Sequence, residues 1–581
     1  MSVFCDDVFP PDITSLCFEP LFKKPDFVKA ITQWRRPRQW CSTARLFDTV
    51  GYLPGDVEQG QIGDCWLLSA FSLVGIFPDV LKRLFVYSNE KEGKYTVRLY
   101  HNGKWNEVTV DDRIPCGSDG LPAYGHNINK KEIWVVILEK AVAKLFGSYE
   151  GIDGGYLEEG VAMLTGGRPE RVYVNSIGDQ AHKKAPTLDQ LWNKMVLYNS
   201  ENTLMGAAIS NSSEQQDKIS GLVAGHAYGI LDVRQTADRK HRLVKLRNPW
   251  GQFEWKGAWC DTSKLWTTVY KKELDAVVSD DGVFWMSFND FASNFDKITC
   301  CRVFNNSLLT MKVDPLIKQE IKHVVFPNAQ WKTRKVEGGW TDENSGGMSN
   351  DTSYQKNPRV KLTCRGNGRY FIIISRPNLP MDADAQYYRS AIGFSIHRGD
   401  GSGNMLRNVP RDDTPNALMQ HPVYGRYNSC ELELTSGDYV ITPLTQYANR
   451  RGTYVLEVYG EKDFDLKPLE GNQYSADIRE GMVSARGNRP DDIAIPTVTQ
   501  ALNNMTMSRT QSKFKSTFDH NRTTVDSSLN KYNTFNSMRP NTVYAKSRTD
   551  ASKLNKSVDR TRNTFFVTTY QDHFNPEQRW G

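Results

Sequence analysis

The chain has 581 residues, 39% hydrophobic and 24% charged, which leaves room for several globular domains with buried cores. No apolar stretch reaches the roughly 18 residues that a membrane-spanning helix needs, so a transmembrane segment is not expected. The ten cysteines include no CxxC pair, and the start MSVFCDDVFPPD lacks the basic and apolar regions of a signal peptide. These features predict a reducing, cytoplasmic setting in which a free thiol can act as a nucleophile.

The net charge of +6 is unevenly distributed along the chain. Residues 501–581 contain 13 Lys and Arg against 6 Asp and Glu, whereas the other 500 residues contain 60 against 61. The excess positive charge therefore lies in the C-terminal tail, which is also rich in Ser, Thr and Asn. This composition predicts a disordered segment, and because it holds no dense basic block, nucleic acid is not expected as a partner.

Local patterns predict the first elements of the fold in chain order. Five prolines interrupt the first 45 residues, so we expect no long element there. The sequence DCWLLSAFSLVGIF, from Asp64, predicts a buried helix with Asp64 as its capping residue. Strand alternation on either side of Asn102 and Gly103 predicts a hairpin, and residues 132–146 predict a second apolar helix.

Beyond Gly167 the pattern shifts towards strands. Strand-like segments up to about residue 306 are HAYGILDV, HRLVKLRN and GVFWMSF. From about 310 to 460 the candidates are RVKLTC, RYFIIIS, AIGFSIHR, GDYVITPL and GTYVLEVYG. Short strands separated by regular turn signals predict an antiparallel β-sandwich in this second region.

The segment EQGQIGDCW has the residues that thiol chemistry needs. Cys65 falls at the expected start of a helix, where the helix dipole and free N–H groups lower the pKa of a thiol and can bind an oxyanion. Gln59 precedes it on a Gly-rich loop, so its amide could turn back towards the same point. A lone cysteine on an apolar helix more often serves core packing, so these residues need further support.

That support comes from two later segments, VAGHAYGI and KLRNPWG. His226 could act as the general base for the thiol, and Asn248 could accept the imidazole N–H and orient the ring. Trp250 could shield that hydrogen bond from water. The order Cys, His, Asn with a preceding Gln, each in a Gly- or Trp-rich context, favours a papain-type cysteine protease site.

These segments resemble the protease core of the calpain family. The matching blocks are QGQIGDCWLLSA, GHAYGILDV and RNPWGQFEWKGAW, connected by VDDRIP, LEKAVAKLFGSYEGIDGG and GVFWMSFNDF. The resemblance covers about 45–300, and a weaker one, through GGWTDENSGG, NPRVKL and SGDYVITP, continues to about 460. It implies that Cys65, His226 and Asn248 are the triad and that Gln59 is the oxyanion donor. It also implies that Trp250 lies between two halves of the core and moves when calcium binds, and we group Trp66 with it as a gating or substrate-contacting candidate.

The resemblance implies an α+β fold. A papain-like protease core of two subdomains is followed by an antiparallel β-sandwich and a disordered tail. The expected boundaries are 1–45 for an N-terminal anchor segment, 46–167 and 168–308 for the two subdomains, 309–462 for the sandwich and 463–581 for the tail.

The resemblance also implies a calcium ion, Ca²⁺, in each half of the core. Oxygen ligands suit this ion. The family pattern falls on Thr49, Gly51, Asp56 and Glu132 in the first half, and on Glu254, Asp261, Ser279 and Asp281 in the second. Two positions depart from the family, because Val283 replaces a carboxylate ligand and Pro54 replaces an arginine that bridges to it. We therefore expect weaker coupling between the two sites, unless other side chains compensate.

The expected function is that of a calcium-regulated intracellular cysteine endopeptidase acting on protein substrates. The alternative is a calpain-like scaffold, with little or no proteolytic activity, that associates with the cytoskeleton. The basic tail is a candidate contact for a cytoskeletal partner. No EF-hand pattern follows residue 460, so a small subunit that pairs through such a domain is not expected.

Overall fold

The computed structural model describes residues 3–18, 25–48, 57–174, 186–209, 220–251, 253–279, 281–304, 307–311, 326–348, 353–376, 391–399, 417–423 and 425–469. Most of the predicted tail therefore lies outside the described residues. Within these ranges no helix combines the length and apolar character needed to cross a membrane.

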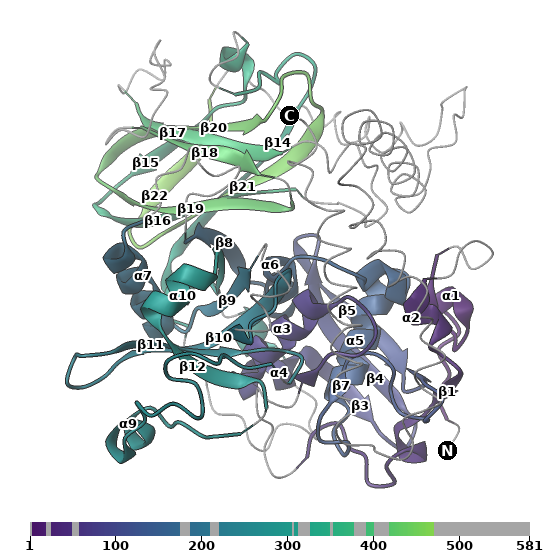
Figure 1. Ribbon diagram of the computed structural model, residues 1–581. Coiled ribbons are helices and arrows are strands. Elements are labelled where there is room, and N and C mark those ends of the chain that lie inside the picture. The colour runs from purple at the N-terminus through teal and green to yellow at the C-terminus, as the bar shows by residue number, and fades with distance from the viewer. Residues whose placement is uncertain are drawn as a thin grey trace, which may run out of the picture. The chain divides into compact units, whose positions relative to one another are not determined.

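The first half of the expected two-subdomain core is built around one buried helix, α3 (Cys65–Gly75). All its residues from Trp66 onward are buried, as expected for a helix that is apolar on every side. Helices α4 (Pro78–Leu84), α5 (Trp134–Leu145) and α6 (Leu157–Thr165) belong to the same hydrophobic core. The two predicted helices of this region are thus confirmed, and α3 lies in the interior (Figure 1).

A three-stranded sheet of β3 (Phe85–Asn89), β4 (Lys94–His101) and β5 (Lys104–Asp111) accompanies these helices. The predicted β4–β5 hairpin is confirmed. Its two turn residues, Asn102 and Gly103, both have positive φ, 51° and 77°, as the tight turn of a two-residue hairpin requires.

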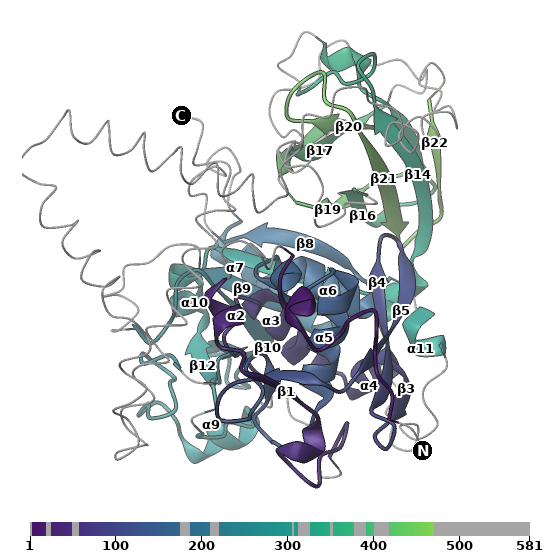
Figure 2. The ribbon, with the colours of Figure 1, turned by 90° about the vertical axis from the view of Figure 1, so that its right-hand side faces the viewer.

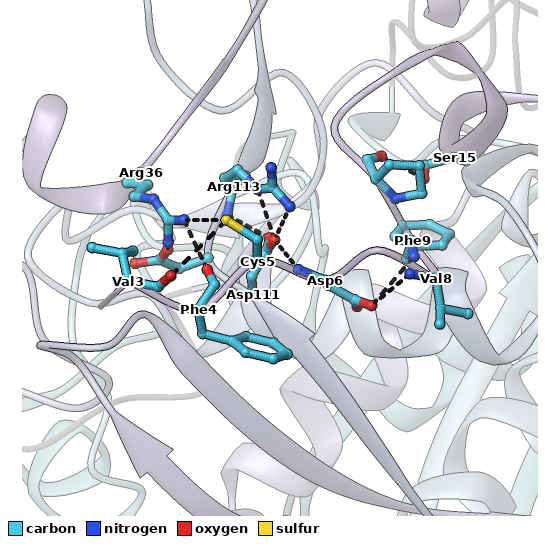
Figure 3. A network of polar contacts seen from close by, with 12 residues as sticks. Val3, Phe4, Cys5, Asp6, Val8, Phe9, Ser15, Arg36, Asp111 and Arg113 are labelled. Carbon is cyan, nitrogen blue, oxygen red and sulfur yellow. Dashed lines mark hydrogen bonds and ion pairs between the residues drawn. The ribbon is translucent and has the colours of Figure 1, made fainter. Parts of the chain in front are cut away.

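The N-terminal residues are fixed to this first core rather than free. Their short elements are α1 (Ile13–Leu16), α2 (Asp26–Lys29), β1 (Gln33–Arg35) and the 3₁₀ turn η1 (Pro37–Gln39). The backbone N–H of Asp6 donates to Asp111 (Figure 3), and the Asp6 carboxylate accepts from Lys144 on α5. Phe9 and Leu16 are buried in the same core as α3.

Four smaller elements, β6, β2, β7 and η3, complete this half. β1 pairs with β6 (Ile114–Cys116), and β2 (Val57–Glu58) pairs with β7 (His126–Asn127). The 3₁₀ turn η3 (Tyr149–Ile152) follows α5. β2 leads directly towards the Gly-rich loop before α3, which places Gln59 close to the start of that helix.

The second half of the expected core is a six-stranded antiparallel sheet in the order β12-β11-β10-β9-β13-β8. Its strands are β8 (Arg168–Tyr173), β9 (Leu204–Ile209), β10 (His226–Gln235), β11 (Arg242–Arg247), β12 (Val283–Ser287) and β13 (Lys297–Arg302). Its helices are α7 (Leu188–Ser200), α9 (Thr268–Glu273) and α10 (Phe288–Asn294). This sheet has its own hydrophobic core, separate from that of α3.

The β-sandwich that follows is confirmed as two antiparallel sheets (Figure 2). One has the order β14-β21-β16-β19 and the other β18-β17-β20-β15-β22. The strands are β14 (Lys332–Trp340), β15 (Val360–Cys364), β16 (Gly368–Ser375), β17 (Ile392–Arg398), β18 (Ala417–Val423), β19 (Tyr427–Leu434), β20 (Gly437–Thr445), β21 (Gly452–Gly460) and β22 (Phe464–Pro468). The remaining short elements are α11 (Ser307–Thr310), η6 (Pro327–Gln330) and η7 (Tyr354–Lys356).

Candidate active site

Cys65 is the first residue of α3, the helix of the first half that contacts β10 of the second half. The backbone N–H groups of Ala227 and Trp66 are within hydrogen-bonding reach of the Cys65 sulfur. Ala227 is the second residue of β10, so the sulfur lies beside the residue that follows His226. One turn along α3, the Ser69 hydroxyl donates to the Ala227 carbonyl at 2.9 Å, which ties the helix to the strand.

Asp64 occupies the position before α3, but it does not cap the helix as the sequence pattern predicted. Its side chain makes no capping hydrogen bond, and it is fully buried. Instead the carboxyl group lies within hydrogen-bonding reach of Glu139 on α5. The capping prediction was wrong because the backbone of Asp64, at φ −102° and ψ 28°, is not in the extended conformation from which a side chain reaches back.

His226 and Asn248 form the best-defined pair of the site. Imidazole Nε2 and the Asn248 side-chain oxygen are 2.8 Å apart, and both residues are fully buried. The Asn248 oxygen also accepts from the Trp250 backbone N–H, while its amide nitrogen donates to the Phe253 carbonyl. With the amide fixed in this orientation, Nε2 must carry the imidazole proton.

The other imidazole nitrogen, Nδ1, has no hydrogen-bond partner among the described residues. It holds the lone pair, so it is the atom of His226 that can take a proton. Pairing of β10 with β11 explains how the two residues meet: Gly229 is opposite Arg247, and the chain continues from Arg247 directly to Asn248. This arrangement is the one that a general base oriented by an asparagine requires.

Trp250 contacts both His226 and Gln59. Its ring lies on the imidazole with centroids 4.3 Å apart, and its indole Nε1 donates to the Gln59 side-chain oxygen at 2.6 Å. The Gln59 amide nitrogen donates to the Ile62 carbonyl at 2.8 Å. One N–H of that nitrogen therefore remains for a further acceptor. Trp66, by contrast, is buried in the first core, and its indole nitrogen donates to Ile152.

Two backbone contacts support this joint between the halves. The Gln59 N–H donates to the Pro249 carbonyl at 3.3 Å, and the Arg247 guanidinium donates to the Val57 carbonyl at 2.7 Å. Gly60 allows the loop to pass close to its neighbours, because a Cβ there would meet the Ala123 carbonyl oxygen at 2.3 Å. The loop with Gln59 is thus fixed relative to both halves.

The protonation states follow from burial. Burial, reinforced by the charge of Asp64, raises the pKa of the Cys65 thiol to about 12. Burial lowers the pKa of His226 to about 4, against the opposing effect of its bond to Asn248. The sequence-based expectation of a lowered thiol pKa is therefore not met, because desolvation of the thiolate outweighs the helix dipole. In this arrangement the thiol and the imidazole are both neutral.

Of the first set of candidate calcium ligands, Thr49, Gly51 and Asp56 lie outside the described residues. Glu132 is buried, and its carboxylate accepts hydrogen bonds from the Asp48 backbone N–H at 2.7 Å and from the Trp134 indole at 3.3 Å. Its oxygen atoms are therefore held in fixed positions immediately beside the chain that leads into residues 49–56.

The second set of candidates surrounds one loop. Glu254 accepts from the backbone N–H groups of Asp281 and Gly282, at 3.1 and 2.9 Å, and Asp261 accepts from that of Ser279 at 2.9 Å. Burial and the negative charges of Asp261 and Asp281 raise the pKa of Glu254 to about 7. Carboxylates close enough to affect one another in this way fit the ligand chemistry of calcium.

The chemical groups of these residues suit calcium, but their positions in the structure do not form a complete set of ligands. Among the residues that the structure describes, no three His, Cys, Asp or Glu side chains are arranged so that they could hold a metal ion. Val283, at the position where a further carboxylate was expected, offers no side-chain oxygen; its backbone N–H donates to Asp281.

Comparison with known proteins identifies the group to which this site belongs. Residues 4–302 match the model of the calpain family cysteine protease, and residues 336–459 match calpain large subunit, domain III. The chain belongs to the calpain family. The first of these matches spans both halves of the core and every candidate catalytic residue.

Individual calpains support the assignment. The chain is 32% identical over 489 residues to the calpain-type cysteine protease ADL1 of Oryza sativa subsp. japonica, 80% of this chain but 21% of that protein. It is 30% identical to calpain-5 of Mus musculus, covering 75% of this chain and 70% of the relative. The calpain-1 catalytic subunit of Rattus norvegicus is 29% identical, with 83% and 68% covered. The chain thus spans about a fifth of the length of the plant relative.

Sequence reasoning missed two groups in the calpain core that lie against the site. One is Ser69, which joins α3 to β10; nothing distinguishes it from any other small residue on a buried helix. The other is Glu139, buried opposite Asp64. A signal for Glu139 was present, because a carboxylate within the apolar run WVVILEKAV has to be paired or protonated when that helix is buried.

Proposed function

We propose that this chain is a calcium-regulated cysteine endopeptidase that performs limited proteolysis of protein substrates. Cys65 is the nucleophile, His226 the base and acid, Asn248 the residue that orients the imidazole, and Gln59 an oxyanion donor. The observation that carries the proposal is the 2.8 Å bond between Nε2 of His226 and Asn248, which leaves Nδ1 as the proton acceptor of the imidazole.

The proposed reaction moves one proton at a time. The Cys65 thiol gives its proton to Nδ1 of His226, and the sulfur forms a bond to the substrate carbonyl carbon. The carbonyl oxygen becomes an oxyanion, for which the start of α3 and the remaining amide N–H of Gln59 provide donors. The C–N bond then breaks as the imidazolium gives its proton to the departing amine. Water, activated by the same imidazole, hydrolyses the thioester and restores the thiol.

The proposed regulation of the protease activity is based on the burial of Cys65 and His226. With the thiol pKa near 12 and the imidazole pKa near 4, proton transfer between them is unfavourable in this arrangement. Calcium supplies positive charge that would neutralise the crowded carboxylates Glu254, Asp261 and Asp281. Trp250 contacts both His226 and Gln59, so any change in its position would alter the environment of both residues. Calcium dependence therefore fits this chain's own residues.

Labelling with a thiol-reactive epoxide inhibitor tests the proposal. We expect Cys65 to be labelled in calcium, labelling to be suppressed by a calcium chelator, and Cys65→Ala to abolish it. Peptide hydrolysis should follow the same pattern. Labelling of Cys65 to the same extent with and without calcium would contradict the proposed calcium regulation. A chain with no labelling and no hydrolysis at any calcium concentration would be the scaffold instead of a protease.

The role of the tail remains a proposal of its own. Residues 470–581 lie outside the described part of the chain, so the proposed cytoskeletal contact rests on their basic, Ser- and Thr-rich composition alone. Co-sedimentation of the full chain with actin filaments or microtubules, compared with a chain ending at residue 469, tests it.

A further inference from the structure

A pair of buried carboxyl groups lies directly behind the nucleophile, and the reaction described above does not use it. Asp64 precedes Cys65, and Glu139 is on α5; their side chains are 0% and 1% exposed. The two carboxyl groups are within hydrogen-bonding reach of each other. Two carboxylates repel at such a distance, and a hydrogen bond between them exists only if one of them holds a proton.

The surroundings give the pair little help in holding two negative charges. Among the described residues, no other residue has an N–H group or hydroxyl that donates to either carboxyl oxygen of Asp64; only its own backbone N–H lies close to them. Glu139 has one donor, the Gly125 backbone N–H at 2.6 Å. The next residue of α5, Lys140, is directed elsewhere, since its ammonium lies 2.6 Å from Asp111. A buried anion without donors or a counter-charge is costly, so the pair favours a bound proton.

The titratable groups that face the pair are acidic or neutral. Asp153, after η3, acts on Asp64 and accepts from the Gly63 N–H. The phenols of Tyr149 on η3 and Tyr124 before β7 are also close enough to be affected by both carboxyl groups. From α3 itself the facing group is the Cys65 thiol. Burial, reinforced by the charge of Asp153 and opposed by the hydrogen bond with Glu139, raises the pKa of Asp64 to about 7. Burial, reinforced by Asp64, raises the pKa of Glu139 well above its usual range.

This charge state affects the nucleophile. A negative charge on Asp64 raises the pKa of the adjacent Cys65 thiol, so each proton removed from the pair opposes formation of the thiolate. We propose that Asp64 and Glu139 are positioning residues that retain a shared proton at neutral pH and so keep the start of α3 from carrying two negative charges beside Cys65. This inference rests on the proposed protease function and adds a proton-dependent control of its nucleophile.

Two isosteric substitutions separate this role from simple packing. In Glu139→Gln the amide can accept from Gly125 through its oxygen and donate to Asp64 through its nitrogen. The only carboxyl group of the pair is then that of Asp64, so any negative charge of the pair lies next to Cys65. In Asp64→Asn the amide donates to Glu139, and the negative charge moves away from the thiol. Both variants keep the hydrogen bond between the side chains, but they place the remaining charge at opposite ends.

The measurement is the pH profile of Cys65 alkylation by iodoacetamide, followed by mass spectrometry of the peptide that contains Cys65. We expect alkylation near neutral pH to be about threefold slower in Glu139→Gln and about threefold faster in Asp64→Asn, corresponding to shifts of about half a pH unit in opposite directions. Glu107→Gln, the same chemical change at a mostly exposed carboxylate of β5, is the control and should leave the profile unchanged. Shifts in the same direction, or no shift in either variant, would overturn the proposal.

A second measurement does not depend on thiol reactivity or on substitutions at Asp64. In full-length chain carrying Cys65→Ala, infrared spectra at pH 7 should show the carbonyl stretch of a protonated carboxylic acid that is lost in Glu139→Gln and kept in Glu107→Gln. Absence of this difference would also overturn the shared proton. A chain that shows the band and the opposite shifts, but hydrolyses no peptide, would refute the proposed protease function and leave the carboxyl pair established.

Discussion

The indole nitrogen of Trp250 donates a 2.6 Å hydrogen bond to the side-chain oxygen of Gln59, and the two residues belong to different halves of the protease core. The bond fixes which end of the Gln59 amide is the donor. The same indole ring lies on His226 at 4.3 Å. One side chain therefore orients the oxyanion donor and covers the base, so its position affects both halves of the catalytic machinery.

Loss of this hydrogen bond should impair catalysis more than stability. In Trp250→Phe the ring can still cover His226, but the Gln59 amide is no longer oriented. We expect kcat for peptide hydrolysis in calcium to fall about 10- to 100-fold with little change in KM, since a misplaced oxyanion donor affects the transition state. Trp340→Phe removes an equivalent indole donor in the sandwich, to Pro443, and should leave kcat unchanged. Equal losses in both variants would contradict this explanation.

Acidification should destabilise the protease core through His226. Its pKa falls from an ordinary 6.5 to about 4 on folding, so the unfolded chain binds a proton between these values and the folded chain does not. The contribution of this difference to the free energy of unfolding is complete above pH 6.5. It decreases by about 3 kcal/mol in total as the pH falls towards 4. Urea unfolding of Cys65→Ala and of Cys65→Ala with His226→Gln, at pH 7 and pH 5, measures it. The decrease in the free energy of unfolding from pH 7 to pH 5 should be smaller in the variant that also carries His226→Gln.

The buried ion pair of Lys140 and Asp111 should be essential to the first half of the core. Both side chains are 0% exposed and their charged atoms lie 2.6 Å apart. Asp111→Asn leaves the ammonium buried without its counter-charge, and we expect a loss of about 3–5 kcal/mol in the free energy of unfolding. Asp26→Asn breaks the exposed pair with Lys29 and should cost less than about 1 kcal/mol. Chemical denaturation of both variants compares them.

Calcium activation should depend on pH if Glu254 is a ligand. Its pKa of about 7 means that a proton competes with the ion in the neutral range. We expect the calcium concentration for half-maximal tryptophan fluorescence change to be roughly tenfold higher at pH 6 than at pH 8. Glu254→Gln should weaken binding and remove most of this pH dependence. A midpoint that is equal at the two pH values would show that Glu254 does not take part.

The fluorescence titration also tests the coupling between the two proposed calcium sites. Val283 and Pro54 replace the two residues that join these sites in the family pattern, so we expect a shallow response with a Hill coefficient near 1. Restoring the pattern with Val283→Glu and Pro54→Arg together should steepen it. A steep response in the unaltered chain would show that other side chains provide the coupling.

Local patterns were sufficient to predict much of the fold. The apolar run after Cys65 predicts α3 because a helix buried on all sides needs no polar face, and Asn102–Gly103 predicts its hairpin because both residues accept positive φ. Features that depend on residues distant in the chain could not be predicted. An Asp before a helix fits a cap equally well, and only the approach of α5 shows that Asp64 faces another carboxyl group instead. The raised thiol pKa likewise depends on burial by the second half.

The anchoring of the N-terminal segment has a consequence for how the protein is made. Phe9 and Leu16 leave the ribosome well before α5, yet their core contacts and the Asp6 bonds to Asp111 and Lys144 require chain that is synthesised later. The nascent segment has to stay unfolded and exposed until α5 has emerged. Slow translation before residue 145 would lengthen that exposure, and a chain started downstream of Leu16 would never complete this core.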